Sequence, residues 1–196
     1  MPTNDKNKVV YGLKNVHVWP ILSTDENGKP TYGTVINMPG ATEMKGDPEG
    51  SSDPFYADDG VYYQATSNTG YSGSFTFANV PDEFKQQILG ETVDANGVIL
   101  EYADAQLKEF AIAFEFKGDK KKTSHLFYRC TATRPSINGA TQEDKVDPQT
   151  EELDFTAIPR LDTGLVRAKT YEGSKAYATW FGDAPYESPA GTAENS

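Results

Sequence analysis

The chain is poor in the residues from which catalytic and covalent sites are usually built. It has one cysteine, Cys130, and two histidines, His17 and His125, among 196 residues. A single cysteine excludes an internal disulfide, so packing must hold the fold together. No apolar run approaches the roughly 18 residues of a membrane-spanning helix, and none follows the charged start MPTNDKNK. We therefore expect no secretion signal, and folding in a cytosol.

Cations are also scarce. Eighteen Lys and Arg residues stand against 29 Asp and Glu, which gives a formal net charge of -11. Because proteins grip phosphate backbones mainly through Lys and Arg, a nucleic-acid-reading domain is not expected. An acidic surface can still serve nucleic acid by not adhering to it, since like charges repel.

Short segments with alternating apolar and polar residues dominate the chain, and Gly, Asn, Asp and Pro separate them. This pattern is typical of an antiparallel β-sandwich or barrel, here with about nine to eleven strands. We expect one mainly β domain over residues 1–182 and a flexible acidic tail over 183–196. One short flanking helix is predicted over 81–89, because a proline suits its first turn and a glycine follows it.

The N-terminal half predicts several strand pairs. Residues 9–22 read as a strand that ends near its proline, with 32–38 as its neighbour. Segment 39–60 is poor in aliphatic residues and rich in breakers, so it is predicted to be a long loop or an extended hairpin arm. Residues 61–66 and 71–80 are predicted to pair as a hairpin across the turn-like SNTG.

The clearest hairpin covers residues 110–133. Alternation places one row of core residues on its first strand: Phe110, Ile112, Phe114 and Phe116. On its second strand alternation groups a second row: Leu126, Tyr128, Cys130 and Ala132. Cys130 is therefore predicted to be a packing residue rather than a nucleophile, and His125 is predicted to point to the opposite face of the strand.

Three further features have both a functional and a structural interpretation. Acidic residues between 47 and 59 suit a calcium ion, but their spacing does not match an EF-hand loop, which favours a solvated loop and no metal. The lysines of segment 117–122 could contact DNA or an acidic neighbour, although charged hairpin tips commonly keep strand ends solvated. Eleven tyrosines and two tryptophans could form a sugar-stacking platform. A β-sandwich carbohydrate-binding module is therefore the alternative function, although such aromatics more commonly form cores or subunit interfaces.

The order of several segments resembles the major tail proteins of long-tailed bacteriophages that infect Gram-positive bacteria. These segments are VYGLKNVHVWPI, MPGATEMKGDPEG, FYADDGVYY, FTFANVPDEFKQQILG and NGVILEY, followed by FEFKGDKKKTSHLFYRCTATRPS and DKVDPQTEELDFTAIPR. The likeness covers residues 7–182, and the order and spacing of the segments carry it rather than any single motif.

The resemblance implies a tail tube subunit: a β-sandwich flanked by a helix, in hexameric rings that stack into a tube around a DNA channel in the virion. It implies no catalysis and no cofactor. The implied partners are further copies of the chain, other tail proteins such as the tape measure and the terminator, and DNA that passes without specific binding; no membrane is involved. Six copies would carry 6 × (-11) = -66 formal charges, which would let DNA slide without being trapped.

Within such a tube, we expect segment 39–60 to reach a neighbouring subunit or ring, because a long irregular segment in a compact domain is usually functional or disordered. The candidate interface residues are Met44, Asp53, Phe55, Tyr56 and Asp58.

Overall fold

The structure is a computed structural model that describes residues 12–57, 59–119, 121–136 and 149–189. Its strands are β1 (Leu13–Thr24), β2 (Pro30–Tyr32), β3 (Ile36–Asn37), β4 (Ala41–Glu49), β5 (Ser52–Ala57), β6 (Gly60–Thr66), β7 (Gly70–Phe77), β8 (Thr92–Val93), β9 (Ile99–Leu100), β10 (Phe110–Phe116), β11 (Ser124–Ala132), β12 (Glu151–Ala157) and β13 (Arg167–Thr170). The helices are α1 (Asp82–Gln87) and a 3₁₀-helix over Tyr177–Thr179. The prediction of a mainly β, antiparallel fold with one short α-helix is confirmed.

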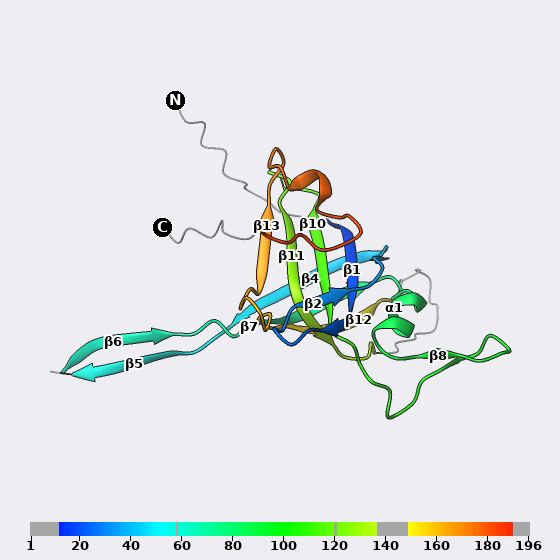
Figure 1. The fold of residues 1–196 in the computed structure, drawn as a ribbon, viewed down its shortest axis with the longest axis horizontal. Coiled ribbons are helices and arrows are strands. Elements are labelled where there is room, and N and C mark those ends of the chain that lie inside the picture. Colours follow the sequence, from blue (N-terminus) through cyan, green and yellow to red (C-terminus); the bar gives the residue numbers. More distant parts are fainter. Residues whose placement is uncertain (1–11, 58, 120, 137–148, 190–196) are drawn as a thin grey trace, which may run out of the picture.

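One large antiparallel sheet organises the chain. Its strand order is β2-β1-β10-β11-β12-β7-β4, with β13 beside β11 and β3 beside β1. The sheet folds over, so that β4, β7 and β12 run across β1, β10 and β11 (Figure 1). Packing of two crossed groups of strands, as in a β-sandwich, buries side chains from both inner faces.

The main core lies between these two groups of strands. The predicted row on β10 points into it: Phe110, Ile112 and Phe114 are buried, and Phe116 is partly buried against it. Phe75, Phe77, Leu153 and Phe155 face them from β7 and β12. The alternation prediction for β10 is therefore confirmed.

A second core covers the other face of β10 and β11. Its fully buried members are Trp19, Ala111, Ala113, Leu126, Tyr128 and Trp180. The C-terminal segment closes it, since the backbone carbonyl of Tyr186 accepts a hydrogen bond of 2.8 Å from the Tyr128 hydroxyl, and the Tyr186 ring stacks on Trp180. The expectation of a loose tail from residue 183 therefore does not hold as far as residue 189; residues 190–196 lie outside the described part.

A β-bulge changes the faces predicted for β11. Phe110 pairs with Cys130 but Ile112 pairs with Phe127, so β11 contains one extra residue between these positions. Leu126 and Tyr128 therefore face the second core, whereas Cys130 and Ala132 face the main core. The predicted single row on β11 was wrong, because a bulge shifts the alternation by one residue.

Strand pairing also corrects the N-terminal half. β1 continues through Pro20 to Thr24, and the proline marks the place where pairing passes from β10 to β2. Segment 61–66 pairs with 52–57 and not with 71–80, because β7 pairs with β4. Residues 41–77 thus form one long hairpin. Of the two forms predicted for segment 39–60, a long loop or an extended hairpin arm, the structure has the hairpin.

The helix α1 forms as predicted and seals one end of the main core. Acidic Asp82 and Glu83 lie in its first turn, where they complement the helix dipole, and Gly90, with φ of +77°, follows its end. Phe84 and Ile88 share a face and are both fully buried. The Glu151 carboxylate accepts hydrogen bonds from the Val80 backbone and the Lys85 ammonium, which ties the helix to β12.

Phe114→Ala is expected to lower the free energy of unfolding by about 3–5 kcal/mol, because it leaves a cavity between the crossed strands. Leu161→Ala is the control: its side chain is 65% exposed, so the change should stay within about 0.5 kcal/mol. Urea unfolding followed by circular dichroism measures both. Equal midpoints for the two variants would contradict this account of the core.

Candidate functional site

The one thiol and its nearest candidate base do not form a catalytic pair. Cys130 is fully buried, and burial raises the pKa of its thiol, with a smaller contribution from Glu109. The bulge places His125 and Cys130 on the same side of the sheet, contrary to the prediction. His125, however, stacks on Phe114 and contacts Phe116, with ring centroids 5.2 and 5.8 Å apart. A buried, protonated thiol is a packing group and not a nucleophile.

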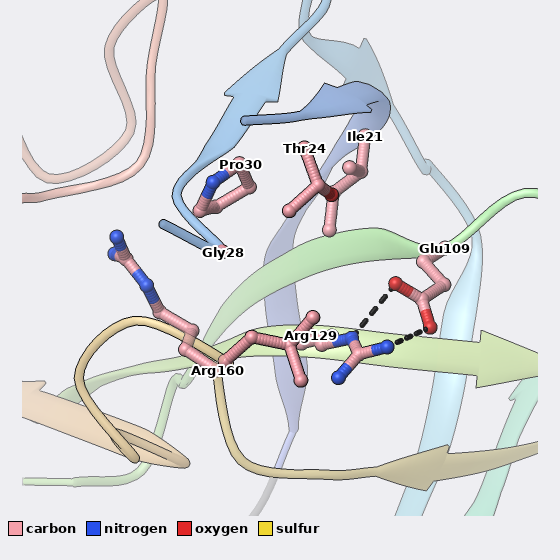
Figure 2. Close-up of a pocket in the computed structure, with 8 residues that line it drawn as sticks. Ile21, Thr24, Gly28, Pro30, Glu109, Arg129 and Arg160 are labelled. Atoms are coloured by element: carbon pink, nitrogen blue, oxygen red, sulfur yellow. Dashed lines mark hydrogen bonds and ion pairs between the residues drawn. The ribbon is translucent and has the colours of Figure 1, made fainter. Parts of the chain in front are cut away.

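The cavity between the β1–β2 turn and the loop after β12 is too small and too well paired to bind a substrate. Its volume is about 10 Å³, which is no more than one water molecule needs. Figure 2 shows the Arg129 guanidinium held by both oxygens of Glu109, at 2.7 and 2.8 Å. Arg160 is bound to Asp162 and Glu187. Neither arginine has its charge available for an anionic ligand.

The tryptophans do not form a binding platform. Trp19 and Trp180 are fully buried in the second core, and their indole nitrogens donate to the backbone oxygens of Gly182 and His125. Among the described residues, no group of three or more acidic, histidine or cysteine side chains could hold a metal ion. Over the same part of the chain, no helix has the length and apolarity needed to cross a membrane.

One broad surface remains, the outer face of β4, β7 and β12. Alternation on these strands sends the core residues inward and the intervening polar residues outward. The central strand β7 contributes only small hydroxyl side chains, and its neighbours contribute charged ones. The outward residues are Glu43, Lys45, Asp47 and Glu49 on β4, Ser72, Ser74 and Thr76 on β7, and Glu152, Asp154 and Thr156 on β12. We call this surface the acidic face.

The acidic face has five carboxylates and one ammonium group. All the charged side chains on it are exposed, and Lys45 pairs with Asp47 at 3.5 Å. The Glu49 carboxylate accepts a hydrogen bond from Ser72. The face therefore presents a hydroxyl surface bordered by negative charge, with an open hollow of about 340 Å³ over β7. The excess of carboxylates repels phosphate groups, and its one ammonium group is paired with Asp47.

The arm formed by β5 and β6 stands away from the body of the protein as a separate two-stranded sheet (Figure 1). Ser51 and Ser67 bind each other at its root, where the Ser67 amide donates to the Ser51 carbonyl at 2.9 Å. Tyr63 on the arm is exposed. An isolated hairpin is at best marginally stable in water, so an arm of this length gains most from a partner surface.

The structure places the predicted interface residues in different environments. Met44 on β4 is partly buried against the main core. Asp53, Phe55 and Tyr56 lie on β5, but their side chains are outside the described part, as is the whole of Asp58.

Sequence reasoning missed Glu43, Glu152 and Asp154 as members of one surface, the acidic face. Alternation of acidic or hydroxyl residues with apolar ones along 72–76 and 152–156 was the signal that could have found them.

A tight backbone contact fixes the pairing of β4 with β7. Gly73 lies in the centre of β7, and a Cβ atom added to it would lie 1.9 Å from the carbonyl oxygen of Lys45. Only glycine lets β4 approach β7 this closely, so the pairing at this point requires glycine.

Comparison with known proteins gives no family model that matches the chain and no curated protein that matches it.

The half-buried His125 predicts a pH dependence. Burial, and then the charges of Arg167 and Lys169, lower the pKa of His125 from 6.5 to about 4. Between these two pH values the unfolded chain binds a proton that the folded chain rejects, so stability falls as the pH falls from 6.5 to 4. Between pH 6.5 and pH 4, the free energy of unfolding of the wild type should fall by on the order of 2 kcal/mol more than that of His125→Phe.

Urea unfolding at pH 7, 5.5 and 4 tests this difference. The variant His17→Gln retains the half-buried His125 and should show the same pH dependence as the wild type. Identical pH profiles for the wild type and His125→Phe would contradict the assignment.

Proposed function

We propose that the chain is a structural subunit of a bacteriophage tail tube, in which six copies form a ring and rings stack around a DNA channel. The observation that carries the proposal is the acidic face: a sheet surface of hydroxyl and carboxylate side chains that the described chain leaves uncovered. We propose that β4, β7 and β12 line the channel with this face.

The charge on this surface suits passage of DNA rather than binding. Phosphate groups bind to Lys and Arg side chains, and their neutralisation makes adhesion strong. Five carboxylates against one lysine give the opposite potential at each subunit. Six subunits around a narrow channel would add their fields, so DNA would move without lasting contacts.

The sheet also ends in a way that supports ring formation. β4 is the last strand in the sheet order and is nine residues long. A long edge strand has a row of backbone groups available for pairing with another chain. In a ring, such edges would be satisfied by the neighbouring subunit, and the arm that extends from β4 and β7 would lie over that neighbour.

The alternative function, a carbohydrate-binding module, was suggested by a sugar-stacking platform of tyrosines and tryptophans, and the tryptophans are not available for it. Both tryptophans are buried, and the exposed tyrosines Tyr63, Tyr102 and Tyr171 lie on the arm, after β9 and after β13. No observation in the described residues favours this second function.

Removal of the arm should abolish assembly and leave the fold intact. Residues 52–66 are replaced by Asn-Gly, because the Ser67 amide already donates to the Ser51 carbonyl as in a two-residue hairpin turn. We expect the wild type to form hollow tubes with sixfold symmetry in negative-stain electron microscopy, and the shortened chain to stay monomeric by light scattering. Glu26→Gln in the exposed β1–β2 turn is the control. A wild type that is monomeric at every concentration, or tubes from the shortened chain, would contradict the proposal.

Charge reversal on the acidic face should make the tubes retain DNA. The variant Glu152→Lys/Asp154→Lys places two ammonium groups per subunit on the proposed channel wall, where phosphates would bind in a salt-dependent way. The variant Glu26→Lys/Asp183→Lys makes the same change of charge at exposed positions elsewhere. Cosedimentation of DNA with tubes at low salt, reversed at high salt, is expected only for the first variant. Equal retention by both would place the acidic face outside the channel.

A further inference from the structure

Positive charge is concentrated in one region of an otherwise acidic molecule. Seven of the 18 Lys and Arg residues lie within segments 117–122 and 167–175. The fold brings these segments together because β13 pairs with β11, with Lys169 opposite His125 and Arg167 opposite Phe127. We call the described members the basic patch: Lys117, Lys121, Lys122, Arg167, Lys169 and Lys175.

Most of the charge on the basic patch is not neutralised within the described chain. Lys122 pairs with Glu172, but no described carboxylate lies within 4.0 Å of the other five cations. The ammonium groups of Lys121 and Lys169 lie 5.9 and 5.7 Å from the ring centre of Tyr171. An exposed aromatic ring between two cations offers both a cationic and an apolar contact to an incoming surface.

Side-chain hydrogen bonds fix the described residues 121–123 of the turn that carries the lysines. Buried Asp119 accepts hydrogen bonds of 2.9 Å from the backbone amides of both Lys121 and Thr123. Lys122 has a φ of +46° at the tip of this turn. A preformed turn loses little conformational freedom on binding, so its charges act more strongly than those of a loose lysine run.

A surface of complementary character lies at the other end of β10. Residues 91–108, which we call the excursion, have four acidic residues and one lysine. One of these carboxylates, Glu101, is paired with Arg134 at 3.0 Å, in a pair whose two side chains are both exposed and whose charges are therefore screened by water. They also contain five of the nine large hydrophobic residues that are exposed in the described chain: Val93, Val98, Ile99, Tyr102 and Leu107. Exposed apolar side chains rimmed by charge mark a protein-binding surface.

The excursion is fixed to the body at both ends. The amides of Glu91 and Lys108 donate to the carbonyls of Lys85 and Ile88, in and just after α1. Its hairpin turn is closed by Asp94, whose carboxylate accepts from the amides of Asn96 and Val98 at 2.8 Å. These hydrogen bonds lower the pKa of Asp94, first through Val98 and then through Asn96.

The excursion and the basic turn lie at opposite ends of β10, with Lys169 and Arg167 of the basic patch alongside the strand between them, level with Phe114 and Ile112. The excursion ends just before β10 begins at Phe110, and the basic turn starts just after β10 ends at Phe116. Seven residues of strand separate them by roughly 20 Å, and Figure 1 shows β8 far from the tip of the β10–β11 hairpin. Two complementary patches at opposite ends of one chain associate head to tail, and that kind of contact repeats along an axis.

We propose that the basic patch of one copy binds the acidic, apolar excursion of a second copy, and that this contact stacks one ring on the next. This proposal rests on the tail tube function and names the surfaces that make the axial contact. Lysines around Tyr171 meet Glu101 and Asp104, while Val98, Ile99 and Tyr102 supply apolar contact area. Six such contacts per ring act together, so a weak contact in each copy gives a strong one between rings.

A second copy of the chain fits the basic patch better than nucleic acid does. The net charge of -11 repels a polyanion approaching the molecule. The exposed apolar side chains of the excursion also need a partner, and nucleic-acid binding by the patch would leave them in water. Binding of the two surfaces to each other neutralises the cations of the basic patch and covers the apolar side chains of the excursion.

Complementary charge reversal tests the contact. One variant, Lys121→Glu/Lys169→Glu, has an acidic patch beside its native excursion. The other, Glu101→Lys/Asp104→Lys, has a basic excursion beside its native patch. Each variant alone brings like charges together at every ring-to-ring contact, so the concentration needed for stacking should rise by at least about tenfold. Mixed in equal amounts, the two variants can alternate with attractive contacts, and stacking should return. Lys29→Glu in the β1–β2 turn is the control.

Negative-stain electron microscopy separates single rings from stacked tubes, and circular dichroism checks that each variant is folded. Single rings from each variant and tubes from the mixture support the proposal. Tubes from either variant alone, or a mixture that stays as single rings, would overturn it while leaving the ring-forming function in place. Absence of rings from the wild type would instead refute the function itself. If a labelled DNA duplex bound the wild type but not Lys121→Glu/Lys169→Glu, and stacking were unchanged, the patch would be a nucleic-acid site.

Discussion

Aromatic packing between the two crossed groups of strands is the interaction on which the rest of the structure depends. Phe75 from β7 contacts Phe114 from β10 and Phe155 from β12, with ring centroids 5.6 and 4.9 Å apart. Phe127 from β11 contacts both Phe114 and Phe155. These four rings hold the two crossed groups of strands together. Because they occupy the inner face of β7 and β12, the intervening residues of those strands must face outward.

That constraint determines the surface that the proposed function uses. Outward residues of β7 and β12 are hydroxyl or acidic, and β4 adds three more carboxylates beside them. The same packing fixes where the arm leaves the body, since β4 and β7 continue from the core into β5 and β6. The β4 and β7 part of the acidic face and the arm are in this sense two ends of one long hairpin, which the phenylalanine cluster anchors.

The second core explains why the opposite side of the sheet has a different character. Ala111 and Ala113 leave room above β10 for Trp19, Tyr128 and Trp180, and the C-terminal segment lies over these rings. Arg160 secures the cover through Asp162 and Glu187. One face of the sheet is closed by its own chain, so the surfaces that the described residues leave for the proposed assembly include the acidic face, the arm and the two ends of β10.

The sequence by itself determined the features that depend on neighbouring residues. Alternation placed Phe110, Ile112, Phe114 and Phe116 in one core row, and the helix over 81–89 followed from its proline, its acidic first turn and its terminal glycine. Burial of Cys130 also followed, although its predicted row was interrupted by the bulge in β11. A bulge is one extra residue, and local pattern contains no signal for where the partner strand will tolerate it.

Only the tertiary structure decided which strands pair and which polar residues share a surface. The sequence suggested that 61–66 pairs with 71–80, because short connections favour neighbours. The fold chose the nested pairing of β4 with β7, since Gly73 allows that close approach and the apolar residues of β7 are buried only there. The acidic face and the basic patch are built from segments far apart in the chain, and the excursion, although one continuous segment, is placed at the opposite end of β10 from the basic turn by the fold. Their composition can be read from the residues, but their position depends on packing between strands that are distant in sequence.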